Sequence, residues 1–433
     1  MSYYDETTND AYVSYFINCS SYHSVKRVWN NLQRSHQKKS SPYATLYSAY
    51  QTVRREILNF LRKSKHNEER TKKLHSFARM LLEYVVILQI RSFSYEETYQ
   101  IFQSLNDRGL KLSQADLVKN EVLKNAQADR ETVLDSWNDA KEYISDLEGI
   151  ALPELLHYSF LSRYGDVKAA RLFPQIKERL NTGLSAKDYA NHLETDAHAL
   201  MELVTSRAYP PRTYELLADI TKRLGHQFVY PILLSLHRKF SQSPSGLEKS
   251  LIFVRSFLIR YMIVGEGTPE GLARIAYKVG EICRKDLSNS SILEELSVCF
   301  ISEAPDAQFK RIFKDYSQRN AAIAGLLVSD IEDYLSRAGG LRVIPQGSSS
   351  HLEHIMPKKV TEQDWPDMLA LQKRDPDEWR ALLWSIGNLM MLPQKLNQKI
   401  QNKAIDVKMA QYNTSPLQLA RLEPYLSNGR WDG

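Results

Sequence analysis

A short segment near the C-terminus combines residue types that suit phosphodiester chemistry. Glu353 and His354 are adjacent in the string His-Leu-Glu-His-Ile-Met-Pro at 351–357. Asn388 follows in Ile-Gly-Asn-Leu, and Asn397 follows in Leu-Asn. A neutral imidazole can activate water, and carboxylate and amide oxygens are the ligands that a hard divalent cation prefers. A nuclease that works with one metal ion needs these groups, so the segment guides the interpretation of the chain.

The elements predicted around these residues form a compact ββα unit. Alternation and turn residues predict short strands over His351–Met356 and Gly387–Leu392. Pro393 then introduces a helix predicted over Gln394–Tyr412. The connection Thr361–Trp384 has apolar residues at helical spacing and is predicted to be a helical insertion. Such a unit would gather the acidic residue, the histidine and the asparagines.

His351 offers a second histidine three residues before His354. A zinc site would have to use both, but their side chains point to opposite faces of an extended strand. A shared zinc ion is therefore not expected. A lone histidine near apolar residues is more often a hydrogen-bonded core group than a catalyst, and that alternative stays open for His354.

Basic residues accompany the motif and also gather in a second region. Lys395, Lys399 and Lys403 repeat every four residues along the last predicted helix, and Lys408 follows them. They would anchor DNA phosphates, or they form a solvated helix face. The range Tyr22–His75 carries thirteen Lys and Arg against three Glu. That surplus attracts polyanions with a salt-dependent affinity, although a solvated surface explains most of it equally well.

The rest of the chain is predicted to be a helical body. The 433 residues are 43% apolar and 25% charged with a net charge of +6, which is ordinary globular composition for two or three domains. Strand signals are nearly absent before residue 340, and Ala338–Ser350, rich in Gly, Pro and Ser, marks the clearest boundary. We expect a mainly α-helical fold with a basic helical segment at 1–74, a helical domain at 75–337 and the ββα domain at 338–433. Helices are predicted over residues 74–90, Thr45–Arg62, Tyr95–Leu105, Leu152–Arg163, Val167–Asn181, Ala186–Arg207, Tyr214–Leu224, Leu247–Val264, Pro269–Lys285 and Ala307–Ser317.

Several classes of protein are not expected. Cys19, Cys283 and Cys299 are isolated from one another, which argues against a disulfide framework and a cysteine-built zinc site. The apolar runs Met80–Ile90 and Leu251–Val264 are short and contain charged residues, so neither is expected to cross a membrane. The polar N-terminus is no signal peptide. A cytoplasmic protein is therefore expected.

Two motifs together resemble a known family. The segment Phe102–Asn120 fits the pattern FxxLNxRGxxLxxxDLxKN. On local chemistry alone it is a helix–turn–helix corner, in which Gly109 ends one helix and Ser113 caps the next. The C-terminal segment resembles the His-Asn-His (HNH, ββα-metal) nuclease motif in its His-Asn-Asn form. In this order, the two motifs resemble the GmrSD-type, modification-dependent (type IV) restriction proteins.

The resemblance implies a role for each residue of the C-terminal motif. Glu353 and Asn397 would bind the metal, His354 would activate water, and Asn388 would hold the loop that aims the imidazole. Asn402 is a substitute for Asn397, but it lies five residues further along the predicted helix. A site of Glu and Asn oxygens suits Mg²⁺ or Mn²⁺. The expected function is cleavage or nicking of foreign or modified phage DNA.

The sequence departs from the family pattern in one respect. Members normally carry an Asp-Gly-Gln-Gln-Arg motif in an N-terminal domain, tied to nucleotide hydrolysis and the sensing of modified DNA, and this chain has no such string. No Walker-type glycine loop replaces it. We therefore expect a separate sensor domain or subunit, with this chain a fragment, a split-gene subunit or a protein that has lost the sensor. The alternatives are a non-catalytic DNA-binding or regulatory subunit of a restriction complex and a helical scaffold.

Overall fold

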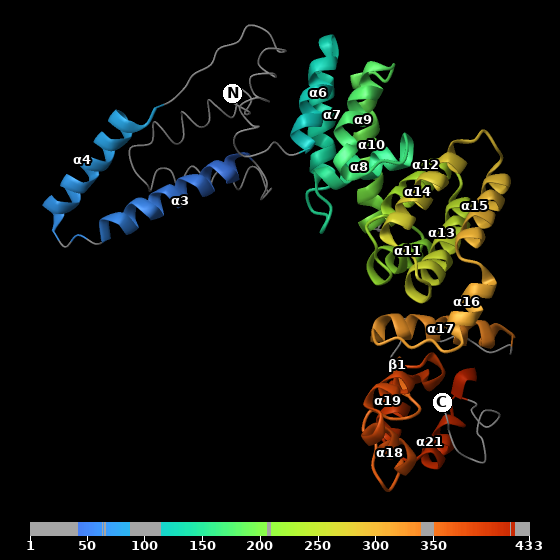
Figure 1. The fold of residues 1–433 in the computed structure, drawn as a ribbon. Coiled ribbons are helices and arrows are strands. Elements are labelled where there is room, and N and C mark those ends of the chain that lie inside the picture. The colour runs from blue at the N-terminus through green and yellow to red at the C-terminus, as the bar shows by residue number, and fades with distance from the viewer. Residues whose placement is uncertain are drawn as a thin grey trace. The chain divides into compact units, whose positions relative to one another are not determined.

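The structure, a computed structural model, describes residues 42–62, 64, 66–86, 114–205, 209–338, 350–415 and 417–420. The chain divides into two compact units, Met1–Leu110 and Lys111–Gly433. Helices dominate both units, and the described ranges contain only two strands, β1 (Ser350–His354) and β2 (Leu389–Pro393) (Figure 1). The predicted mainly α-helical fold is confirmed. The predicted domain borders after residues 74 and 337 stay predictions.

The first unit contains two described helices, one within the basic segment and one that begins in it. α3 (Pro42–Arg62) covers the helix predicted from Thr45, and α4 (Asn67–Tyr84) follows. Glu68 and Glu69 lie in the first turn of α4, where their charges complement the helix dipole. The helix predicted over Tyr95–Leu105 and most of the motif that ends at Asn120 lie outside the described residues.

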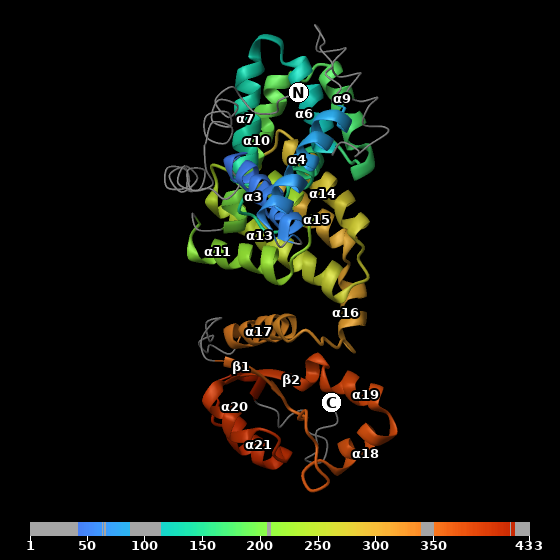
Figure 2. The same ribbon diagram turned by 90° about the vertical axis from the view of Figure 1, so that its left-hand side faces the viewer.

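In the helical body of the second unit, the helices pack directly against one another (Figures 1 and 2). Leu155, Leu193 and Leu234 are buried where its helices meet, and burying each such side chain contributes about 1.5–3 kcal/mol. Within the described ranges no helix is long and apolar enough to cross a membrane. Its helices are α6 (Gln114–Asn125), α7 (Arg130–Tyr143), α8 (Leu152–Arg163), α9 (Leu172–Asn181), α10 (Ala186–Thr205), α11 (Pro211–Ala218), α12 (Val229–Lys239), α13 (Pro244–Leu258), α14 (Pro269–Arg284), α15 (Asn289–Glu303), α16 (Asp306–Phe313) and α17 (Ala321–Ala338).

Two predicted helices of the body end in a wider helical turn. The helices expected to run on to Leu224 and Val264 close in π-helical turns, Asp219–Arg223 and Ile259–Val264. The second turn ends at Gly265, where an added Cβ would lie 2.6 Å from the carbonyl oxygen of Arg260. Glycine is needed there because any side chain would collide with the widened turn.

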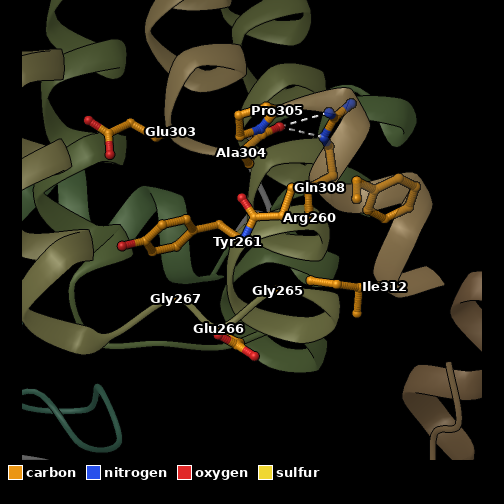
Figure 3. A pocket seen from close by; sticks show the side chains of 11 residues that line it. Arg260, Tyr261, Gly265, Glu266, Gly267, Glu303, Ala304, Pro305, Gln308 and Ile312 are labelled. Atoms are coloured by element: carbon orange, nitrogen blue, oxygen red, sulfur yellow. Dashed lines mark hydrogen bonds between the residues drawn. The ribbon is translucent and has the colours of Figure 1, made fainter.

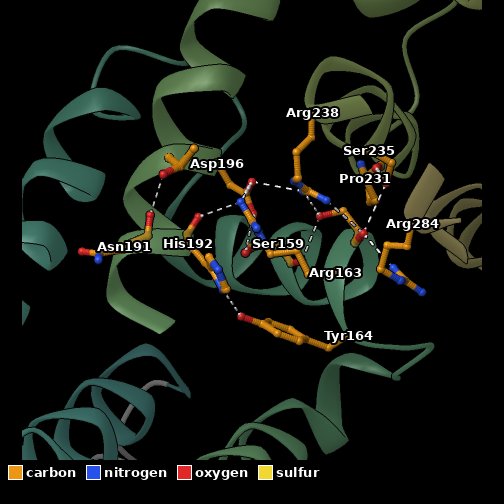
Figure 4. A network of polar contacts seen from close by, with 12 residues as sticks. Ser159, Arg163, Tyr164, Asn191, His192, Asp196, Pro231, Ser235, Arg238 and Arg284 are labelled. Atoms are coloured by element: carbon orange, nitrogen blue, oxygen red, sulfur yellow. Dashed lines mark hydrogen bonds and ion pairs between the residues drawn. The ribbon is translucent and has the colours of Figure 1, made fainter. Parts of the chain in front are cut away.

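A buried polar network joins α8, α10 and α12 (Figure 4). The Asp196 carboxylate, 2% exposed, accepts hydrogen bonds from Arg163 Nε and Nη2, both at 2.7 Å. It also accepts from Ser159 Oγ at 2.7 Å and Arg238 Nη2 at 3.2 Å. Burial opposes ionisation, but Arg238 and Arg163 hold the pKa of Asp196 below its usual value. The network therefore cross-links three helices through one charged group.

Cavities of the helical body lie beside the second π-helical turn. One of about 200 Å³ is lined by Arg260, which donates to the carbonyl oxygen of Ala304 and stacks over the Phe309 ring at 5.2 Å (Figure 3). A larger one of about 770 Å³ is lined by His157 and Phe228 among others, and Tyr261 lines both. Neither contains a residue of the predicted nuclease motif.

The C-terminal part is the predicted hairpin with a helical insertion. β1 and β2 pair antiparallel with Ser350 opposite Pro393 and His354 opposite Leu389. Their connection contains α18 (Pro366–Arg374), α19 (Pro376–Leu383) and a 3₁₀ turn (Ile386–Asn388), and α20 (Gln394–Ile400) and α21 (Ile405–Tyr412) follow β2. The single helix predicted over 394–412 is therefore wrong. Gln401 has a φ of 41°, a left-handed conformation that ends α20.

The body and the hairpin are joined by hydrogen bonds as well as by packing. α17 packs against both strands, and Leu389 of β2 belongs to the apolar core of the body. The Ile386 N–H donates to the carbonyl oxygen of Tyr316 at 3.0 Å, and the Gln318 N–H donates to that of Trp384 at 2.9 Å. The segment after α16 thus pairs with the segment just before β2.

Candidate active site

His354 lies at the end of β1 in a defined orientation. Its Nδ1 is 2.9 Å from the carbonyl oxygen of Leu383, and its ring meets the Trp384 ring edge-on at 4.7 Å. A carbonyl oxygen only accepts, so Nδ1 carries the hydrogen and Nε2 has the free electron pair. Burial lowers the pKa of His354 to about 4, against the opposing effect of the bond to Leu383. The imidazole is therefore neutral near pH 7 and able to accept a proton at Nε2.

The side chain of Asn388 hydrogen-bonds two backbone segments next to His354, at Met356 and at Leu383. Its side chain, 1% exposed, accepts the Met356 N–H at 2.7 Å and donates to the carbonyl oxygen of Met356 at 3.2 Å. It also donates to the carbonyl oxygen of Leu383 at 3.0 Å. That is the oxygen that holds His354, so one amide fixes both the loop after β1 and the acceptor of the imidazole. The orienting role of Asn388 in catalysis stays a prediction.

Glu353 points away from His354, as adjacent residues of a strand do. It is opposite Met390, and both side chains are buried. Its Oε1 accepts hydrogen bonds from Lys408 Nζ at 2.6 Å and from the Tyr412 hydroxyl at 3.1 Å. Burial raises the pKa of Glu353, while Lys408 acts in the opposite direction. The carboxylate is therefore held against α21.

The structure places Lys408 in the core and not on the DNA-facing surface predicted for it. Its side chain is fully buried and also donates to the carbonyl oxygens of His354 at 2.8 Å and Ile355 at 3.0 Å. A buried ammonium with three acceptors has no access to phosphate, so the predicted DNA contact is corrected. Lys408 and Tyr412 share one face of α21 because they are four residues apart, and that spacing was the available signal for their joint role.

The remaining predicted residues are distributed over α20 and the turn that follows. Lys395, Lys399 and Lys403 are exposed, but Lys403 lies beyond the end of α20 and so outside the regular stripe. Their contact with DNA stays a prediction. Asn397 is half-buried and precedes the buried Ile400 by three residues, which puts both on the inner side of α20.

The oxygen donors suit Mg²⁺ or Mn²⁺ in type, but they are few. Among the described residues, no group of three or more His, Cys, Asp and Glu side chains could hold a metal ion. Glu353 can offer a cation only its second oxygen, because Oε1 already accepts two hydrogen bonds. The inward-facing Asn397 supplies an amide oxygen, which is also a hard ligand. The two residues thus have the donor type that an oxygen-preferring cation takes, and a metal site here stays a prediction.

Trp384 and Lys358 adjoin His354, although sequence reasoning gave them no part in the site. Trp384 was predicted only to pack within the insertion. Lys358 follows β1 by four residues, and its Nζ lies 4.9 Å from the centre of the Trp384 ring. A cation–π pair between a loop and a helix end has no signature in local sequence, so only the fold shows it.

Two domain models of one family match the chain. Residues 304–432 match the model for GmrSD restriction endonucleases, C-terminal domain, and residues 1–123 match that for the N-terminal domain. Residues 1–123 therefore correspond to the N-terminal domain of this family, although the sequence does not contain the Asp-Gly-Gln-Gln-Arg string. No curated protein matches the chain. The two matches cover more than half of the sequence, so the chain belongs to the GmrSD restriction endonuclease family, with a nuclease role in restriction and DNA as its substrate.

Proposed function

We propose that the chain is an HNH-type endonuclease or nickase that hydrolyses DNA with a divalent metal ion, and that His354 is its general base. The observation that carries the proposal is the state of this imidazole. Nδ1–H is fixed on the carbonyl oxygen of Leu383, and the ring is neutral near pH 7. A nuclease base needs this tautomer, because the free electron pair on Nε2 must take the proton of water.

In the proposed reaction the residues of the chain move one proton and hold the reacting groups. His354 Nε2 takes a proton from a water molecule, whose oxygen attacks phosphorus as the bond to the 3′ oxygen breaks. Asn388 keeps the imidazole aimed through the Leu383 carbonyl. Glu353 and Asn397 would hold Mg²⁺ or Mn²⁺, which supplies charge neutralisation at the phosphate and the departing oxygen. Lys395, Lys399 and Lys403 and the basic segment at the N-terminus would hold the DNA backbone.

The wider role follows from the family. We propose that the DNA restricted is foreign or modified phage DNA, encountered in the cytoplasm. A separate domain or subunit with the Asp-Gly-Gln-Gln-Arg string would sense the modification and hydrolyse the nucleotide.

A second candidate function is a non-catalytic, DNA-binding or regulatory subunit of a restriction complex. It is favoured by the ion pair between Lys408 Nζ and Glu353 Oε1 at 2.6 Å, which already neutralises the one predicted carboxylate ligand. Such a subunit would bind DNA and cut none.

The two candidates are separated by plasmid nicking with Mg²⁺ or Mn²⁺. We expect His354→Ala to lower the rate by about 10²–10⁴-fold, as removal of a general base does. His351→Ala is the matched control, because His351 is an exposed histidine of the same strand. It should cleave like the wild type, and EDTA should stop both. Equal cleavage by wild type and His354→Ala would refute the proposed mechanism, and binding without cleavage by the wild type would favour the regulatory subunit.

A further inference from the structure

Lys358 presents a positive charge at the rim of the site. It directly follows Pro357 in the loop after β1, and its side chain is exposed. Its Nζ lies over the face of the Trp384 ring, 4.9 Å from the centre. The negative face of an indole attracts an ammonium, so the ring holds this otherwise flexible side chain in place.

Trp384 is itself fixed, and it contacts the proposed base. Its ring meets His354 edge-on with the ring planes at 87°, and its carbonyl oxygen accepts the Gln318 N–H of the helical body. Lys358 and His354 are thus neighbours of one indole ring. An ammonium and an imidazole placed on the same platform can meet the same phosphodiester.

The charge of Lys358 has no acidic partner among the described residues. In contrast, the ammonium of Lys408, which is also close to His354, donates its hydrogen bonds to Glu353 and to two backbone carbonyl oxygens. Among the described residues near His354, Lys358 therefore has an ammonium that remains available to a ligand. A phosphate oxygen is the acceptor that fits an exposed ammonium beside a nuclease base.

We infer that Lys358 binds a non-bridging phosphate oxygen of the DNA at the point of cleavage, and that Trp384 is the positioning residue that holds it there. The inference rests on the proposed function and deepens it by naming the group that sets the phosphate against His354. Lys359 is the matched comparison, because it is the next residue, carries the same charge and is exposed. No contact of Lys359 with the Trp384 ring is seen in the described structure.

The first test measures binding and does not depend on cleavage. In the His354→Ala protein, the affinity for a fluorescein-labelled duplex is measured by anisotropy over a range of salt concentrations. Lys358→Ala should reduce the slope of log Kd against log salt by about one, since one phosphate contact is lost. Trp384→Leu should reduce the slope by the same amount. Trp384→Phe should keep most of the wild-type slope, because phenylalanine retains an aromatic face. Lys359→Ala should change the slope by less. Equal slopes for Lys358→Ala and Lys359→Ala would overturn the inference.

The second test measures plasmid cleavage with Mn²⁺. Lys358→Ala should lower kcat/KM by about tenfold, in line with a lost charge-assisted contact, while Lys359→Ala stays within about twofold of the wild type. Unchanged thermal unfolding of each variant shows that the fold is retained. If wild type and His354→Ala cleave equally, the proposed function fails, and the salt slopes still decide on Lys358. If they differ but both lysine variants cleave equally, only the inference on Lys358 fails.

Discussion

The ion pair between Glu353 and Lys408 gives the sharpest test of how the site is held. Lys408→Met keeps most of the volume of the side chain and removes its charge and three hydrogen bonds. The Glu353 carboxylate, 5% exposed, would then be a buried charge without its counterion. Breaking a buried pair in this way costs about 3–5 kcal/mol. The two carbonyl oxygens that lose a donor add to that cost unless water replaces it.

Hydrogen exchange measured by mass spectrometry on the full chain localises the effect. A loss of about 4 kcal/mol lowers the protection of the strand amides by about a thousandfold, because each 1.4 kcal/mol is a factor of ten. The peptides to follow cover β1 and β2, and peptides from α8 and α10 of the body serve as an internal reference. Lys403→Met is the matched control, since Lys403 is an exposed lysine of the same domain and should change protection little.

A double substitution separates the charge from the hydrogen bonds. Adding Glu353→Gln to Lys408→Met removes the unpaired charge, so part of the protection should return. The rest should stay lost, because the carbonyl oxygens of His354 and Ile355 still lack their donor. Protection in Lys408→Met within about tenfold of the wild type would refute the reasoning, and so would a double variant less protected than the single one.

Three further predictions concern the body, the imidazole and the metal. Asp196→Asn should destabilise the helical body by about 3–5 kcal/mol in urea unfolding, because it leaves Arg163 and Arg238 without a counterion. Since the folded pKa of Asp196 lies below its usual 3.8, its stabilisation is complete above that value and lost as the pH falls through the lower folded pKa. The difference between the variant and the wild type should therefore shrink below about pH 4. Asn388→Ala should lower kcat more than it raises KM in plasmid nicking. The substitution removes the hydrogen bond to the Leu383 carbonyl oxygen that orients His354, and Asn388 is not expected to contact DNA. An increase in KM alone would contradict this. Asn397→Ala should raise the Mn²⁺ concentration for half-maximal cleavage by about tenfold, whereas the exposed Asn402→Ala should not, and equal effects would exclude Asn397 as the ligand.

The sequence predicted the elements of the site better than their contacts. The hairpin, the helical insertion and the start of the helix after Pro393 depend on local patterns, which is why their positions agree with the structure to within a few residues. The break at Gln401 could not be foreseen, because a glutamine rarely adopts a positive φ and nothing nearby signals it. That break determines whether Lys408 is exposed or buried. On one continuous helix Lys408 would continue the row of exposed lysines, but on α21 its side chain points into the core.

The contacts that orient His354 were beyond sequence reasoning for a different reason. They are made with backbone carbonyls, and a carbonyl has the same chemistry at every position of a chain. The role of Asn388 was predicted from the family motif, whereas its acceptor at Leu383 appears only when the insertion is folded. Lys358 and Trp384 are 26 positions apart in sequence and meet for the same reason.

The helical insertion between β1 and β2 therefore contributes contacts that position His354. The carbonyl oxygen of Leu383, at the end of α19, accepts from both His354 and Asn388, and the next residue supplies the ring between His354 and Lys358. The segment from Trp384 to Ile386 is in turn hydrogen-bonded to residues 316–318 of the helical body. A displacement of that body segment would move the acceptor of the imidazole and the platform of Lys358 together. The imidazole of His354 is therefore coupled to the helical body through backbone hydrogen bonds of two neighbouring residues, Leu383 and Trp384.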